Sequence, residues 1–283
     1  MTRYRLSTAV AALAALGVFA PAAMAGPRYA SPQASGGGAC TSADPCALEN
    51  AIENASSGEE VILKPGTYSV TNPVDASEAV DIHGQDGQAV PRLIGASDAT
   101  EPTLTMSGGG SISRVFASSS ANSAAAFDLD GVIADGIEAK ATNGAYGIEL
   151  YGSVLGTILR NSVSRADNGG AAVQVKDRLA GASTTIIGVT ALGTNGADGV
   201  VVKSTLSPTT VKNTIARGTY DVEKKQTALA PVVSYSNFRP ASSVGATIGA
   251  GNQSAAPLFA SEATGDLRPV AGSPTIDAAA LMR

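Results

Sequence analysis

A short pattern recurs between Ala126 and Gln226 and determines the expected fold. Its copies read Phe127-Asp128-Leu129-Asp130, Ile148-Glu149-Leu150-Tyr151, Val173-Gln174-Val175-Lys176, Val200-Val201-Val202-Lys203 and, in degenerate form, Val222-Glu223-Lys224-Lys225. Successive copies begin 21, 25, 27 and 22 residues apart. Turn signals lie between them, at Asn143-Gly144, Asn168-Gly169 and Asn195-Gly196. A period in the twenties without helical patterning predicts a solenoid of stacked β-coils.

Strand-like segments also fill the rest of the chain. A second strand in each coil aligns over residues 136–141, 157–163, 184–191, 210–216 and 232–238. Two or three strands per turn, stacked at roughly 4.8 Å per coil, make an all-β parallel β-helix. Residues 59–238 are expected to form about seven or eight coils. Residues 239–283 are expected to form a looped tail packed on the last coils.

The first 25 residues have the pattern of a secretory signal peptide. Arg3 and Arg5 precede an apolar run over residues 9–20, and small residues lead up to Ala25, just before Gly26. This pattern predicts cleavage between Ala25 and Gly26, because the run is too short to span a bilayer. The alternative is an uncleaved membrane anchor. No later apolar run is long enough to span a membrane, so we expect a secreted or cell-envelope protein.

An entry segment, residues 26–44, holds the first of two cysteines, Cys40, and Cys46 follows shortly after it. In an exported protein, so close a pair predicts a disulfide. Two free thiols or half of a metal site are the alternatives, and no histidine lies nearby. Closing so short a loop is expected to stabilise the fold by about 2 kcal/mol.

A short helix is expected over residues 45–58. Asp44 is a suitable N-cap, Pro45 fits the first helical position, and Gly58 ends the segment. One face of this helix is apolar, through Leu48, Ala51, Ile52 and Ala55. An open β-solenoid ends in unpaired strand edges, so the helix is expected to cap the N-terminal end of the stack.

Composition excludes some classes of function. The chain has 19 Lys and Arg against 24 Asp and Glu, a net charge of −5. A mildly acidic chain without a basic tail is a poor nucleic-acid binder. The apolar fraction of 44% and the charged fraction of 15% exclude a disordered chain.

The repeat also predicts which side chains face outward. The first and third residues of each copy are apolar and face inward, so the second and fourth point outward. Stacking in register gives two exposed columns: Asp128, Glu149, Gln174, Val201, Glu223, and Asp130, Tyr151, Lys176, Lys203, Lys225. Tyr151, Lys176 and Lys203, with Arg178 just beyond, are the candidate substrate-binding residues, since ammonium groups bind carboxylates and a ring packs under a sugar. The alternative is an ordinary solvated face whose lysines oppose aggregation.

Three segments together resemble the secreted right-handed parallel β-helix proteins of the pectin-lyase-like superfamily. They are Cys40…Asp44-Pro45-Cys46-Ala47-Leu48-Glu49-Asn50-Ala51-Ile52 with Val61-Ile62-Leu63-Lys64-Pro65-Gly66-Thr67-Tyr68, the irregular coils with Asn-Gly turns, and Asp266-Leu267-Arg268-Pro269…Gly272-Ser273-Pro274-Thr275-Ile276-Asp277. The resemblance covers nearly all of the chain after residue 25. It implies the fold but no single activity, since the superfamily includes lyases, hydrolases, esterases and adhesins.

The chain lacks the active-site motifs of the known enzyme branches. The Asn-Thr-Asp, Asp-Asp, Gly-His-Gly and Arg-x-Lys motifs of polygalacturonases are missing, as are the clustered aspartates of pectate lyases. Asp128 and Asp130 are spaced as a glycoside hydrolase pair requires. Lys176 or Lys203 would be the base of a uronate lyase, the one case in which Ca²⁺ would take part. No other cofactor and no metal site is indicated.

Three polar residues are interpreted as structural. His83 is the single histidine and is expected to be a turn residue. Asn161 and Asn213 occupy equivalent positions, where asparagines stack in solenoids.

The sequence therefore predicts a non-catalytic surface protein that contacts carbohydrate, with an extracellular polysaccharide or cell-surface component as partner. The alternative is a polysaccharide-degrading enzyme. Within this alternative, a lyase that acts on an acidic glycan is favoured over a glycoside hydrolase. No catalytic residue is assigned at this stage.

Overall fold

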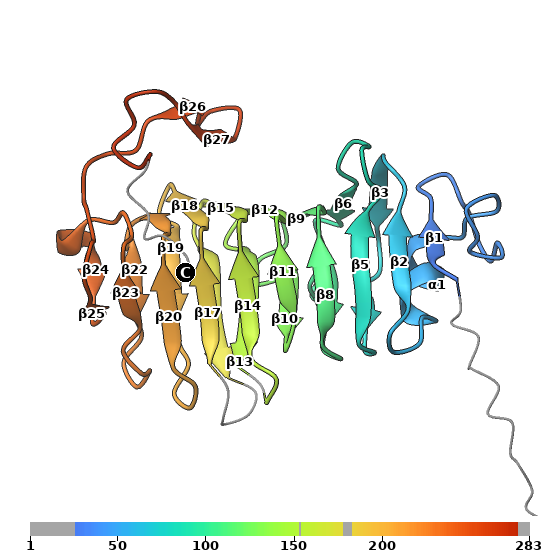
Figure 1. Ribbon diagram of the computed structural model, residues 1–283, viewed down its shortest axis with the longest axis horizontal. Coiled ribbons are helices and arrows are strands. Elements are labelled where there is room, and N and C mark those ends of the chain that lie inside the picture. The colour runs from blue at the N-terminus through green and yellow to red at the C-terminus, as the bar shows by residue number, and fades with distance from the viewer. Residues whose placement is uncertain (1–25, 153, 178–182, 277–283) are drawn as a thin grey trace, which may run out of the picture.

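The computed structural model describes residues 26–152, 154–177 and 183–276. The predicted signal peptide and Arg178 lie outside the described residues. The described chain forms a parallel β-helix whose stacked coils build three parallel sheets (Figure 1). The predicted all-β parallel β-helix is confirmed.

Sheet A holds ten strands. In spatial order they are β1 (Arg28–Ala30), β2 (Glu60–Leu63), β5 (Val80–Gly84), β8 (Gly110–Ser113), β11 (Ile133–Asp135), β14 (Thr157–Arg160), β17 (Thr184–Ile187), β20 (Thr209–Lys212), β23 (Val232–Ser234) and β25 (Thr247–Ile248). Every pair of neighbouring strands in this sheet is parallel.

Sheets B and C complete each coil. Sheet B holds β3 (Thr67–Val70), β6 (Arg92–Gly95), β9 (Phe116–Ser119), β12 (Glu138–Thr142), β15 (Val163–Asp167), β18 (Thr190–Thr194) and β21 (Ile215–Arg217). Sheet C holds β4 (Val74–Ala76), β7 (Leu104–Met106), β10 (Ala125–Asp130), β13 (Tyr146–Gly152), β16 (Ala171–Asp177), β19 (Asp198–Val202), β22 (Val222–Lys224) and β24 (Ser243–Val244). From β2 to β22 the chain passes from sheet A to B to C in each successive coil.

The core is the inside of the coil stack. Columns of apolar side chains run along it, for example Leu104, Phe127, Ile148, Val173 and Val200 on sheet C. All five of these side chains are fully buried. Burial of stacked apolar columns at roughly 25 cal/mol per Å² is the main force holding the coils together.

Two kinds of turn bend each coil. From β8 to β21, sheets A and B are joined through a residue with positive φ, and Asn161 and Asn213, each with φ of 50°, take this position. Sheets B and C are joined in three coils by Asn-Gly pairs, beginning at Asn143, Asn168 and Asn195, in which both residues have positive φ. Asparagine and glycine tolerate this left-handed conformation, which explains why they recur there. Asn161 and Asn213 are separated by one coil, whose turn residue is Gly188, so they are not stacked on each other.

The N-terminal helix is shorter than predicted. Helix α1 spans Leu48–Glu53, and its N-cap is Ala47, so the prediction that Asp44 caps it is wrong. The Asp44 carboxylate instead accepts the N–H of Ala39 at 3.0 Å. Buried side chains of α1 pack against β1 and β4 at the N-terminal end of the stack. Its role as a cap stays a prediction.

The entry segment contributes structure that the sequence did not indicate. Strand β1 pairs in parallel with β2 and so extends sheet A beyond the first coil. Cys40 and Cys46 form the predicted disulfide, with Cα atoms 4.6 Å apart. In the described part of the chain, no helix is long and apolar enough to cross a membrane.

The C-terminal segment leaves the coil stack and turns back over sheet B. A 3₁₀ turn, η1 (Pro240–Ser242), precedes β24, and the strands β26 (Phe259–Ser261) and β27 (Asp266–Pro269) form an antiparallel hairpin. Figure 1 shows this hairpin standing off the side of the body formed by sheet B. The Gly265 backbone at the hairpin turn lies against the Arg165 guanidinium of β15.

Candidate functional site on sheet C

The two predicted columns of side chains are present on sheet C in the predicted register. Paired residues of the first column are Asp128, Glu149, Gln174, Val201 and Glu223, and those of the second are Asp130, Tyr151 and Lys176. Lys203 comes directly after β19, and its backbone N–H donates to the Val175 carbonyl at 2.8 Å, which continues the ladder.

Four of the five residues of the first column are buried, so the prediction that they are exposed is wrong. The exposed fractions of Asp128, Glu149, Gln174 and Val201 are 6%, 4%, 1% and 2%. The physical reason is that lysines of the second column bend back over it. Lys176 reaches Glu149, and Lys203 reaches Gln174. The second column therefore shields the first from water, while Lys203 itself stays exposed on the face of the sheet.

Lys176 lies at the centre of these contacts. Its Nζ lies 2.5 Å from Oε1 of Glu149 and donates to the phenol oxygen of Tyr151 at 3.4 Å. The three residues come from β13 and β16, which are neighbours in sheet C. Two of the four candidate binding residues, Tyr151 and Lys176, are thus in direct contact, while Arg178 lies outside the described residues.

Tyr146 belongs to the site, although the sequence interpretation did not include it. Its ring centroid lies 5.7 Å from Nζ of Lys176 and 5.7 Å from Nζ of Lys203, so it receives a cation–π contact from each. Lys203 also donates to Oε1 of Gln174 at 3.3 Å. The signal for Tyr146 is its position two residues before the repeat motif of its coil, at the start of β13. We call Tyr146, Glu149, Tyr151, Lys176 and Lys203 the Tyr–Lys cluster.

The electrostatics of the cluster hold Tyr151 neutral and Lys176 charged. Burial raises the pKa of the Tyr151 phenol, the nearby charges of Glu149 and Asp128 raise it further, and Lys176 only partly offsets them. Burial lowers the pKa of Lys176, but its hydrogen bond and charge interaction with Glu149, together with Tyr151, bring it above its ordinary value. A protonated phenol and an ammonium group therefore stand side by side near neutral pH.

Asp177 fixes the loop that follows Lys203. Its carboxylate accepts from the Ser204 hydroxyl at 2.5 Å and from the Leu206 N–H at 2.8 Å, and also bonds both the N–H and the hydroxyl of Thr205. Burial raises the pKa of Asp177, but these hydrogen bonds outweigh it and leave the pKa lowered. Asp177 thus positions the backbone next to Lys203 and stays ionised.

Other sequence candidates fall outside the Tyr–Lys cluster or differ from expectation. Asp128 and Asp130 share the outer face of β10, and both are nearly buried. His83 is not a turn residue but lies within β5 on sheet A, where its Nε2 is 2.8 Å from Oε1 of Glu60. Among the described residues, no group of three or more His, Cys, Asp or Glu side chains is arranged to hold a metal ion.

The comparisons with known proteins agree with this architecture. An alginate lyase from Paenibacillus sp. str. FPU-7 is similar in structure, with a TM-score of 0.51 and 16% sequence identity over 80% of this chain and 95% of that one. The chain has the pectin-lyase-like β-helix fold. A pectin methylesterase from carrot matches with a TM-score of 0.45 and 11% identity, over 81% of this chain and 82% of that one. No family model and no curated protein matches the sequence.

Within this pectin-lyase-like fold, the chemistry is argued from the residues themselves. A cluster of titratable groups with shifted pKa values on a solvent-facing sheet is typical of a functional site. The Tyr–Lys cluster combines a proton donor, two cations and an aromatic ring. These are groups suited to a negatively charged sugar chain.

Proposed function

We propose that the protein is a polysaccharide lyase that binds an acidic glycan across sheet C and cleaves it by β-elimination. The observation that carries the proposal is the contact between Tyr151 and Lys176, in which an ammonium group donates to the oxygen of a phenol whose pKa is raised. β-Elimination at a uronate needs a cation near the carboxylate, a base for the C5 proton and an acid for the leaving oxygen.

The cluster supplies a group for each need. Lys176 has three N–H donors, of which Glu149 and Tyr151 engage two, so it also binds the uronate carboxylate. Tyr151 donates its proton to the leaving glycosidic oxygen, and the adjacent Lys176 ammonium stabilises the phenolate that forms.

Lys203 is assigned as the base. Its contacts within the described residues are to the Gln174 amide and the Tyr146 ring, beside the Tyr151–Lys176 pair. In the proposed reaction Lys203 takes the C5 proton. The electron pair of the C5–H bond forms the C4–C5 double bond, and the C4–O bond breaks as Tyr151 protonates the oxygen. Proton transfer through water then restores both residues.

The similarity to an alginate lyase, named above, supports the reaction class without assigning the substrate. The disulfide fits a polysaccharide partner outside the cell, and so would the predicted signal peptide and the predicted extracellular or cell-envelope location. Ca²⁺ is not assigned a role by the described residues.

A second candidate is a non-catalytic protein that binds glycan on the same sheet. The ion pair of Lys176 with Glu149 favours it, because an ammonium group held in that form is a binding group and not a base.

One experiment separates the two candidates. The purified protein is incubated with alginate, polygalacturonate and a neutral glucan, with and without Ca²⁺. We expect absorbance from unsaturated uronates with one or both acidic substrates and none with the glucan. Loss of this activity in Lys203→Gln, with glycan binding retained, supports the assigned base. Binding without any turnover by the folded wild-type protein supports the second candidate and contradicts the first.

A further inference from the structure

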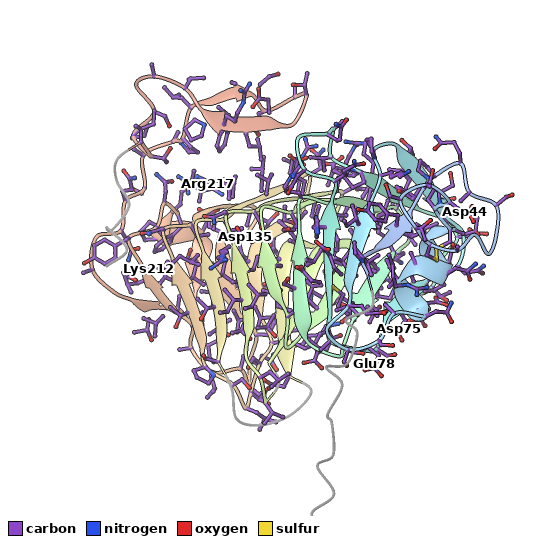
Figure 2. The ribbon with its side chains drawn as sticks, turned by 45° about the vertical axis from the view of Figure 1, so that its right-hand side comes forward. Asp44, Asp75, Glu78, Asp135, Lys212 and Arg217 are labelled. Carbon is purple, nitrogen blue, oxygen red and sulfur yellow. A yellow bond between two sulfur atoms is a disulfide. The ribbon has the colours of Figure 1, made fainter. Side chains whose placement is uncertain are left out.

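A groove separates the C-terminal hairpin from the outer face of sheet B, on a different side of the body from the Tyr–Lys cluster. It consists of two hollows of about 570 and 460 Å³, which share Leu192, Thr194, Asn195 and Glu262 as lining residues and are therefore continuous. The hairpin forms one wall through Phe259, Glu262 and Ala263. Figure 2 shows Arg217 on the side of the body that faces this hairpin.

Four cations line the groove. Three of them, Lys140, Arg165 and Arg217, belong to one column on the outside of sheet B. The column runs in register across β12, β15, β18 and β21, with Leu192 between the two arginines. Arg239 lines the same groove in the next coil. Neighbouring coils are roughly 4.8 Å apart, so the positive charges follow the long axis of the groove.

Arg217 and Arg239, at the C-terminal end of the groove, carry more positive charge than the carboxylate between them can neutralise. Asp221 is fully buried and accepts from Arg239 Nη2 at 2.6 Å, while its other oxygen lies 3.5 Å from Arg217 Nη1. Two guanidinium groups thus share one carboxylate, which leaves one charge uncompensated.

Arg165 is the most informative residue of the groove. It is half-buried, yet it forms no hydrogen bond and no ion pair with any residue that the structure describes. Its guanidinium lies close to the Gly265 backbone, where a Cβ would fall 2.3 Å from both terminal nitrogens. A guanidinium carries five N–H donors, and leaving them unsatisfied in a half-buried place costs free energy unless a ligand or water accepts them.

The remaining lining residues suit a sugar. Thr194 and Asn195 supply hydroxyl and amide groups, and Phe259 supplies an aromatic ring on the opposite wall. Asp167 and Glu262 also line the groove, and they would repel a ligand with a dense, continuous run of negative charge. The chain as a whole carries a net charge of −5, which further disfavours nucleic acid.

From this arrangement we propose that the groove beneath the C-terminal hairpin is a second glycan-binding site, which takes a carboxylate-bearing oligosaccharide with Arg165 and Lys140 as its anion-binding residues. The proposal stands apart from the reaction assigned to sheet C, because no residue is shared. A second binding site would hold the protein on its polysaccharide independently of turnover.

The test uses a short oligogalacturonate, its methyl-esterified form and a single-stranded oligonucleotide of equal charge. Binding is measured by calorimetry at low salt in the Tyr151→Phe background, so that no turnover occurs. Arg165→Gln is the test variant, and Lys212→Gln on sheet A is the control with the same change in charge. Thermal unfolding of each variant shows that the fold is retained.

We expect the oligogalacturonate to bind at two sites in the background protein, and Arg165→Gln to weaken one of them roughly tenfold. Lys212→Gln should leave both unchanged, and the ester should lose the groove site. Equal affinity in Arg165→Gln and the background, or equal binding of ester and acid, overturns the proposal. Tighter binding of the oligonucleotide at the groove overturns the glycan assignment. Turnover by Arg165→Gln in the otherwise wild-type protein tests only the lyase reaction proposed for sheet C. The binding measurements test the groove, so the failure of one proposal can be told from the failure of the other.

Discussion

Nζ of Lys176 lies 2.5 Å from the carboxylate of Glu149, although the two residues belong to neighbouring coils and Glu149 is almost entirely buried. The ion pair joins the two coils on their outer face, and it orients the ammonium group toward Tyr151. This one contact therefore bears both on the stability of sheet C and on the reaction proposed for it.

Replacing Lys176 by Met should destabilise the fold by about 2 kcal/mol, because the buried Glu149 carboxylate loses its counter-ion. Lys176 is partly exposed, which keeps the loss below that of a fully buried pair. The double variant Lys176→Met/Glu149→Gln should recover part of the loss. Urea unfolding of the two single variants and the double variant gives the coupling free energy. Strictly additive effects would show that the contact contributes nothing.

Replacing Tyr151 by Phe should lower the rate of elimination by roughly 10²–10⁴-fold, the range of a general acid, while glycan binding stays within a few-fold. The change removes only the phenol oxygen to which Lys176 donates. Tyr220→Phe, at an exposed tyrosine outside the cluster, is the matched control. Equal rates in Tyr151→Phe and wild type would remove Tyr151 from the mechanism.

His83 should make stability depend on pH. Burial lowers the pKa of His83, but the bond to Glu60, the Gly84 carbonyl and the charge of Asp81 raise it above its ordinary value. The folded state therefore binds a proton more tightly than the unfolded state. The contact of protonated His83 with Glu60 contributes less than about 1 kcal/mol to the free energy of unfolding, because Glu60 is partly exposed. This contribution is fully present below the pKa that His83 has in the unfolded state, and it is lost as the pH rises through the pKa of the folded state.

The measurement compares wild type with His83→Gln by urea unfolding at pH 5.5 and pH 8. The advantage of wild type should be larger at the lower pH. The same difference at both values would mean that the Glu60 contact does not favour the imidazolium form.

The Asn-Gly turns should tolerate glycine better than alanine. Asn195 has φ of 50°, and its amide donates to Asp167 at 2.7 Å. Asn195→Ala should cost about 1–2 kcal/mol, because it loses this bond and strains the left-handed backbone, whereas Asn195→Gly loses only the bond. Thermal unfolding of both variants measures the difference. A smaller loss for alanine than for glycine would contradict the account.

Reducing the Cys40–Cys46 disulfide should lower stability by about 2 kcal/mol, as expected for closing a short loop. The loop lies beside β1, whose Tyr29 exchanges backbone hydrogen bonds with both cysteines. The variant Cys40→Ser/Cys46→Ser should unfold at a lower temperature than the oxidised protein, and reductant should not affect the variant. An unchanged melting temperature would show that the loop is held by its backbone bonds alone.

The coil stack was predictable because aligning the copies of the repeat also gives the register between neighbouring strands. Once Phe127, Ile148, Val173 and Val200 are aligned, the inward and outward faces of sheet C follow from the two-residue period of a strand. The third sheet was harder to see. Strands β14 and β15 are separated only by a short turn at Asn161, and the strand-like sequence pattern continues through this turn. The predicted segment 157–163 therefore merged parts of two strands into one.

The candidate site was predictable in Tyr151, Lys176 and Lys203, but not in Tyr146 or in its burial. Sequence patterning places Glu149 and Lys176 on one face, yet it cannot show that Lys176 bends back to shield Glu149, because that depends on the conformation of a long side chain. Strand β1 was missed since its three residues follow no repeat, and pairing with β2 is decided by tertiary contacts.

The most direct test of the central claim compares new double bonds with new reducing ends in one digest of an acidic polysaccharide. Wild-type protein is incubated with the substrate that gives turnover in the panel, and both products are quantified over time. The account predicts equal molar amounts of the two, with Tyr151→Phe losing both together. Reducing ends without double bonds would identify a hydrolase and contradict the assignment of the Tyr–Lys cluster to β-elimination.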